Sequence, residues 1–150
     1  ERWAQMIDAA CTGLDDPAEV FAVSLRISGR LAWTHPEIAA FITGVGLDLL
    51  DAPRGLAPRA LRDIRAGQAA GRFSIRDAEV ALGAVAGGLL GLLRLHERNP
   101  ERVSESSVDE LAEACLRFFG LPGAQARRLA RRRLPEARWS AGHAEGDKED

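Results

Sequence analysis

Signals that begin helices recur along this chain, and they constrain its fold more than any other feature of the sequence. Asp16 is followed by Pro17 and, three positions after the aspartate, by Glu19, which is the pattern of a capped helix start. A similar start, with proline in the first helical position, occurs at 34–37. Apolar residues then recur at intervals of three and four positions, as they do on one face of a helix. The sequence therefore predicts an all-α fold.

The helices expected from these starts end at Gly and Pro residues further along the chain. We expect them over residues 17–33, 36–50, 58–70, 75–98, 107–120 and 124–133, with one more before Thr12. Ser74 is the expected cap of the 75–98 helix, and Ser107 is that of the next one. Together the helices form a predicted domain over 1–133, and the polar stretch 134–150 is predicted to be a frayed tail.

Composition narrows the class of protein further. The chain has 150 residues, of which 46% are hydrophobic, and its formal net charge is −2. This balance excludes a disordered chain and one that holds nucleic acid by its bulk charge. The distant Cys11 and Cys115 form no zinc pattern, so a reduced, cytoplasmic protein is expected. The uncharged stretch 80–93 is shorter than the roughly 20 residues of a membrane span, and it predicts a core helix with no membrane partner.

Motifs that would carry catalysis are missing from the sequence. None of its three histidines lies in a metal-binding HExxH pattern, and the pair Gly44 and Gly46 lacks the third glycine of a dinucleotide-binding loop. The one lysine, Lys148, follows no glycine run. We therefore expect no enzyme and no metal or other cofactor. His35, at a helix start, is expected to cap a backbone amide, and a ligand contact is the alternative.

Glycines recur along one stripe of the longest expected helix. Gly83, Gly87 and Gly91 lie at i, i+4 and i+8, and each costs about 1 kcal/mol of helix propensity relative to alanine. The stripe allows close packing of another helix, either within the chain or from a second copy of it. We favour a homodimer whose four-helix bundle takes 75–98 and 107–120 from each chain. The predicted interface residues are Gly83, Gly87, Gly91, Leu111, Cys115 and Phe118.

Two segments resemble the regulatory domain of TetR-family transcriptional regulators. They are 31–41, LAWTHPEIAAF, and 63–73, DIRAGQAAGRF, and the Gly/Ala/Leu-rich helix after them fits the same family. The resemblance covers about residues 1–133 and implies the effector-sensing, dimer-forming part of a repressor. In this family a helix-turn-helix head precedes that part, and no segment here matches it. The chain, which begins with Glu1, is expected to belong to a longer protein, with operator DNA a partner only through such a head.

A largely apolar cavity for a small apolar effector is expected between the helices 17–33, 36–50, 58–70 and 75–98. Trp33 is the expected lid. Gln68 lies on an apolar line, where its amide either reaches water or bonds a polar group of the ligand. The alternative function is a helical oligomerisation module without a small ligand. The predicted ligand-binding residues are Phe21, Leu25, Trp33, Phe41, Val45, Ile64 and Gln68.

Overall fold

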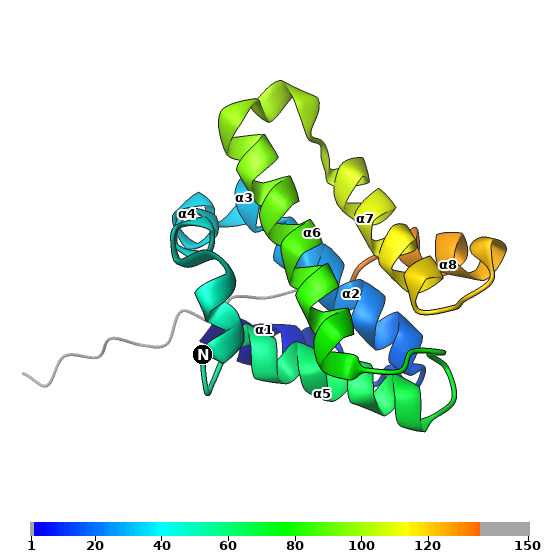
Figure 1. Cartoon of the computed structure of the whole chain (residues 1–150). Helices are drawn as coiled ribbons and strands as arrows, with labels where there is room; N and C mark the ends of the chain where they lie inside the picture. The colour runs from blue at the N-terminus through cyan, green and yellow to red at the C-terminus, as the bar shows by residue number, and fades with distance from the viewer. Residues whose placement is uncertain (1, 136–150) are drawn as a thin grey trace, which may run out of the picture.

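Helix α6, Ala78–Arg98, runs through the middle of the molecule, and the other helices pack around it (Figure 1). The computed structural model describes residues 2–135, and no strand occurs within them, which confirms the all-α prediction. The remaining elements are α1 (Arg2–Ala10), α2 (Pro17–Gly29), α3 (Leu31–Thr34), α4 (Pro36–Val45), the 3-10 helix η1 (Gly46–Asp51), α5 (Leu56–Ala69), the 3-10 helix η2 (Pro100–Arg102), α7 (Glu105–Phe118) and α8 (Gly123–Ala130).

The predicted start of α2 is confirmed. The side chain of Asp16 accepts a hydrogen bond from the Ala18 N–H at 3.0 Å, and Pro17 is the first helical residue. The predicted helix 17–33 is wrong in its extent, because α2 ends at Gly29 and the single turn α3 follows it. Arg30 between them has ψ −4°, which tightens the last turn of α2. Glycine has a low helix propensity, and it weakens the helix at this point.

Two predicted caps are wrong: a contact distant in sequence delays the start of α6, and a local capping box begins α7 earlier than expected. The Ser74 N–H donates to the Phe119 carbonyl at 2.8 Å, so this segment stays extended, and Asp77 caps α6 instead. Helix α7 begins one turn before the predicted Ser107, at the N-cap Ser104. Ser107 is then the third helical residue, and its hydroxyl accepts from the Ser104 N–H.

The predicted helix 36–50 is also shorter than expected. Helix α4 ends at Val45, because Gly46 adopts a φ of 66° that no α-helix allows. The chain continues as η1, which brings its leucines back toward α5 and α6. Helix α5 begins at Leu56 rather than at Pro58, which still lies in the first turn, where proline is tolerated.

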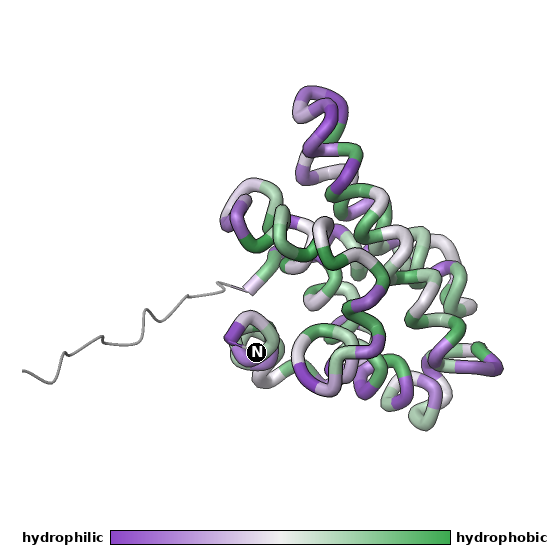
Figure 2. Tube along the Cα trace, turned by 60° about the vertical axis from the view of Figure 1, so that its left-hand side comes forward, coloured by the Kyte–Doolittle hydropathy of each residue, from purple (hydrophilic) through white to green (hydrophobic). Residues whose placement is uncertain are grey.

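The apolar residues form two adjoining clusters. One contains the rings of Phe21, Phe73 and Phe119, whose centroids lie 4.7 to 6.0 Å apart. The other surrounds Ile7 and Leu93, between α1, α2 and α6. The tip of the α6–α7 hairpin, around η2, is hydrophilic and projects away from both clusters (Figure 2). The core therefore lies along the middle and lower part of α6 as drawn in Figure 1.

Helix α6 is long and apolar enough to cross a membrane by its length and composition. The uncharged stretch 80–93 lies inside this helix of 21 residues, and the flanking turns bring the apolar segment to that length. A single such helix is weak evidence for a membrane span, since core helices of water-soluble proteins meet the same criterion. Only 28% of its most apolar stretch is buried, so much of its surface is open to a partner.

The predicted tail 134–150 lies outside the described residues except for Leu134 and Pro135. Leu134 is half-buried and packs against the cluster around Ile7. The chain just before it is fixed by Arg26, whose guanidinium donates to the Arg132 carbonyl at 2.7 Å and pairs with Asp109 at 2.7 Å. The described end of the chain is therefore held against α2 and α7.

Candidate functional site

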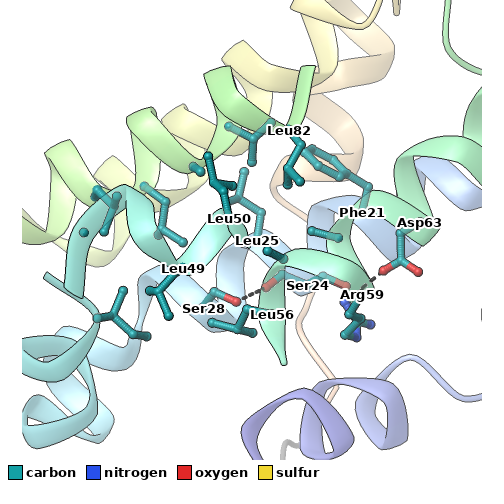
Figure 3. Close-up of a pocket in the computed structure, with 18 residues that line it drawn as sticks. Phe21, Ser24, Leu25, Ser28, Leu49, Leu50, Leu56, Arg59, Asp63 and Leu82 are labelled. Atoms are coloured by element: carbon teal, nitrogen blue, oxygen red, sulfur yellow. Dashed lines mark hydrogen bonds and ion pairs between the residues drawn. The ribbon is translucent and has the colours of Figure 1, made fainter. Parts of the chain in front are cut away.

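A cavity of about 90 Å³ lies between α2, η1, α5 and α6, with Ile42 of α4 at its edge (Figure 3). These are the helices that the sequence predicted to enclose a cavity, with η1 in place of the last turn of the 36–50 helix. Most of its wall is aliphatic. The lining residues are Phe21, Ser24, Leu25, Ser28, Ile42, Gly46, Leu49, Leu50, Leu56, Ala57, Arg59, Ala60, Asp63, Leu82, Val85, Ala86, Leu89 and Leu90.

Two serines of α2 contribute hydroxyl groups to this wall. The Ser24 hydroxyl donates to the Val20 carbonyl at 2.6 Å, and the Ser28 hydroxyl donates to the Ser24 carbonyl at 2.8 Å. Each donor is satisfied within the helix, and each oxygen keeps acceptor capacity. The serines thus make this side of the cavity polar without leaving an unpaired hydrogen.

A buried ion pair forms the strongly polar part of the wall. Arg59 and Asp63 lie one turn apart on α5 and are 6% and 7% exposed. Arg59 Nη1 forms an ion pair with Asp63 Oδ2 at 2.9 Å. The angles of this contact do not make it a hydrogen bond, so Asp63 Oδ2 has no hydrogen-bond donor. Asp63 Oδ1 is also 3.1 Å from Arg62 Nη2. Asp63 Oδ2 is therefore a buried acceptor with capacity for a further donor.

The ion pair extends to α1 through a second carboxylate. Arg59 Nε donates to Asp8 Oδ1 at 2.8 Å, and Arg62 Nη2 donates to the same oxygen at 2.7 Å. Burial alone would raise the pKa of Asp8, but the hydrogen bonds and charges of the two arginines outweigh it and lower the pKa below its ordinary value. Two carboxylates and two guanidinium groups thus form a charge-balanced cluster beside the cavity.

Phe21 and Leu25 are the predicted ligand-binding residues that line this cavity. Ile64 is fully buried, but it packs in the adjoining core. The Trp33 ring packs at a tilt against His96, with ring centroids 4.5 Å apart, and is not among the residues that line the cavity. Phe41 is 65% exposed, because α4 turns Ala39 and Ile42 inward.

The other predicted polar and apolar positions have structural contacts of their own. Val45 ends α4 and is half-buried outside the cavity lining. The Gln68 amide donates to the carbonyls of Ile75 and Arg76 at 3.0 and 3.3 Å, so it ties the end of α5 to the segment before α6. His35 occupies the N-cap position of α4, but the predicted side-chain cap is not formed. Its ring instead lies 3.1 Å from the Thr34 hydroxyl.

Sequence reasoning missed Ser24, Ser28, Arg59 and Asp63. The sequence does contain a signal for Arg59 and Asp63. Ala57, Ala60 and Ile64 mark an apolar face of α5, and this oppositely charged i, i+4 pair lies beside that face. The pattern does not say that the pair is buried. Among residues 2–135, no group of three or more His, Cys, Asp or Glu side chains could hold a metal ion.

The predicted interface residues on α6 are open in the single chain. A Cβ atom added at Gly83, Gly87 or Gly91 would meet no atom within 4 Å, other than those of its own helical surroundings. Large apolar side chains border the stripe, with Val80 66% and Leu95 44% exposed. The glycine stripe is therefore not used to pack helices within the chain.

On α7 the predicted interface residues differ from one another. Phe118 is 57% exposed and Leu111 is half-buried beside Gly88, whereas Cys115 lies in the core. Burial raises the pKa of the Cys115 thiol to about 11. Cys11 and Cys115 are both free thiols.

Comparison with known proteins identifies the family. Residues 16–132 match the family model of the tetracyclin repressor-like C-terminal domain. The structure of RolR in complex with resorcinol has a TM-score of 0.72 and 31% identity, over 91% of this chain and 67% of that one. The structure of RolR without ligand has a TM-score of 0.73 and 36% sequence identity, over 87% of this chain and 66% of that one. No curated protein matches this chain. The chain belongs to the TetR family of transcriptional regulators and is a C-terminal regulatory domain of that family, not an enzyme.

Proposed function

We propose that this domain senses a small, largely apolar effector in the cavity between α2, η1, α5 and α6. Binding of the effector then controls the affinity of a helix-turn-helix head for operator DNA. DNA is a partner of the domain only through that head. The regulator works in the cytoplasm. The cavity carries the proposal, because an apolar enclosure with a few fixed polar groups is the usual form of a small-molecule site. The ligand-bound state must favour one of two arrangements of the regulator.

The size and chemistry of the cavity favour one phenolic ring. An apolar cavity of about 150 Å³ accepts benzene, and 90 Å³ is of the same order, so the cavity suits a ligand of about one ring. A phenol hydroxyl has a proton to donate to Asp63 Oδ2, while the ring contacts Phe21, Leu25 and Leu82. The relative RolR is named in complex with resorcinol, a benzene ring with two hydroxyl groups. We therefore assign hydroxylated single-ring aromatics as the ligand class.

We also propose that the domain forms a homodimer through α6 and α7. The open glycine stripe and the exposed Val80, Leu95 and Phe118 lie on these two helices. Helices faced with glycine can approach closely, and exposed apolar side chains favour burial against a partner. Family membership supports the same arrangement, since regulators of this family act as dimers.

Calorimetric titration with resorcinol, phenol and benzene tests the ligand site. Ala60 lines the cavity, whereas Ala66 on the same helix is exposed, so the same change to leucine can be made inside and outside it. Ala60→Leu is expected to weaken phenol binding about tenfold or more, and Ala66→Leu is expected to leave it unchanged. Asp63→Asn is expected to weaken phenol about tenfold and to spare benzene, which has no hydroxyl.

Circular dichroism spectra of both leucine variants show whether each still folds. If phenol binds equally to the Ala60 and Ala66 variants, the cavity is not the site. If resorcinol, phenol and benzene all fail to bind the folded wild-type domain, the sensing proposal is refuted for this ligand class. An oligomerisation module without a small ligand then becomes the better description.

A further inference from the structure

One side of the cavity is formed by a segment that is not α-helical, residues 46–55. Gly46, Leu49 and Leu50 of this segment line the cavity, and every other lining residue lies in α2, α4, α5 or α6. In Figure 3 the side chains of Leu49 and Leu50 point from η1 toward α2. The segment therefore covers a cavity whose remaining wall is built from packed α-helices.

Few interactions hold this segment against the core. None of residues 46–55 is buried. Leu49 and Leu50 are half-buried, and each packs against one of the two apolar clusters. The charged side chains of the segment are exposed, and within residues 2–135 they form no ion pair or side-chain hydrogen bond; they are those of Asp48, Asp51 and Arg54. Apolar contact has no preferred direction, so a segment held in this way can separate from the core at low cost.

Both ends of the segment are glycines in backbone conformations that other residues rarely adopt. Gly46 has φ 66° and ψ −141°, and Gly55 has φ 107° and ψ −141°. A Cβ atom built at either glycine would meet no atom within 4 Å. The backbone at both points thus lies in open space, where neighbouring side chains do not block its rotation. These are the properties of hinge positions at the ends of a lid.

We propose that residues 46–55 are a lid, which opens about Gly46 and Gly55 to admit the effector to the cavity. The inference rests on the proposed function for its ligand. In the closed state, Leu49 and Leu50 complete the apolar wall. Opening withdraws both leucines from the cavity and connects it with solvent, while the α-helical part of the wall stays in place. The lid thereby controls how fast a ligand enters and leaves.

The same glycine-to-alanine change can be made inside and outside a hinge. Gly46→Ala places a side chain at a φ of 66°, which strains the closed lid. Gly44→Ala is the matched control, because Gly44 lies within α4 and its added Cβ also meets no atom within 4 Å. We expect Gly46→Ala to raise the open fraction of the lid about tenfold and Gly44→Ala to leave it unchanged.

Alkylation by iodoacetamide measures the opening without a ligand. Leu82→Cys, made in every variant, places a thiol in the cavity wall, while Cys115 is a core thiol outside the lining and reports opening of the whole fold. Mass spectrometry of peptides follows the two thiols separately. Gly46→Ala should speed alkylation at position 82 about tenfold and leave that of Cys115 unchanged. Equal acceleration of both thiols, or no acceleration at position 82, would overturn the lid.

A second pair of variants decides the question if Gly46→Ala does not fold. Leu50→Ala removes an apolar contact that holds the closed lid, whereas Leu47→Ala shortens a leucine of the same 3-10 helix that is 55% exposed. Leu50→Ala should speed alkylation at position 82 about tenfold, and Leu47→Ala should not. Identical rates in these two variants would refute the lid.

Resorcinol separates the lid from the ligand class. If it binds, Gly46→Ala should make both association and dissociation about tenfold faster and leave Kd unchanged, because the strain weakens closure alike in the free and the bound domain. NMR line shapes of resorcinol measure these rates. Binding at wild-type rates overturns the lid and leaves the proposed function intact. If position 82 responds as expected but resorcinol does not bind, the lid stands and the phenolic ligand class fails.

Discussion

Replacing Gly87 by leucine has opposite expected effects on the stability of the single chain and on the association of two chains into a dimer. Gly87 lies in the middle of α6, and a Cβ atom there would meet no atom within 4 Å. In the single chain the substitution therefore gains helix propensity, about 0.8 kcal/mol, and creates no clash. In the proposed dimer the leucine stands where two helices pack at about 8–10 Å between their axes. Overpacking of that kind costs about 1–3 kcal/mol for each leucine. A two-fold dimer contains two of them, one from each chain.

The expected result is a more stable chain that dimerises about 30-fold more weakly, or not at all. Sedimentation velocity over a concentration series measures association, and urea denaturation at low concentration measures the stability of the chain. Gly44→Leu is the matched control, because Gly44 is also exposed on a helix and its added Cβ meets nothing within 4 Å. The reasoning is refuted if Gly87→Leu sediments like the wild-type dimer. A wild-type chain that stays monomeric at every concentration would refute the dimer itself.

Two further predictions concern stability. Gly67→Ala is expected to lower the free energy of unfolding by about 1–3 kcal/mol, measured in urea, because the added Cβ collides with the Phe73 ring; unchanged stability would show that the ring moves freely. A hydrogen bond from Arg72 lowers the pKa of Asp16 below 3.8, so this carboxylate stabilises the fold above pH 3.8 and the contribution is lost as the pH falls through its lowered pKa. Wild type should therefore lose more thermal stability than Asp16→Asn below pH 3.8, and parallel curves for the two proteins would contradict this assignment.

The helix starts that depend on neighbouring residues could be predicted from the sequence. Asp16 caps α2 with its own side chain, and nothing distant is needed to place it. The start of α6 could not be predicted in the same way. Ser74 is a good cap residue, but its N–H is bonded to the Phe119 carbonyl, 45 positions later. A local signal was overridden there by a hydrogen bond to a residue distant in the sequence.

Apolar spacing located the helices around the cavity but not every side chain that faces it. Helix α4 is apolar on more than one side, so its sequence is compatible with burying either Phe41 or Ile42. The structure buries Ile42 and leaves Phe41 65% exposed, because Gly46 redirects the chain into η1, which fixes the orientation of α4. Leu49 and Leu50 line the cavity for the same reason. A φ of 66° at one glycine, invisible in a hydropathy pattern, decided which residues form the wall.

The polar part of the cavity wall could not be predicted from the sequence, because charged residues are expected to be exposed to solvent. Arg59 and Asp63 are buried beside Asp8, which lies 51 positions before Arg59 and pairs with both arginines of the cluster. A buried ion pair is a poor way to stabilise a core, since apolar replacement of similar volume is often neutral or stabilising by about 1–4 kcal/mol. The double variant Arg59→Met, Asp63→Leu is therefore expected to unfold in urea at the wild-type midpoint or above it, while phenol binding is lost. A large loss of stability would show instead that the pair is kept for the fold, and that its place beside the cavity is incidental.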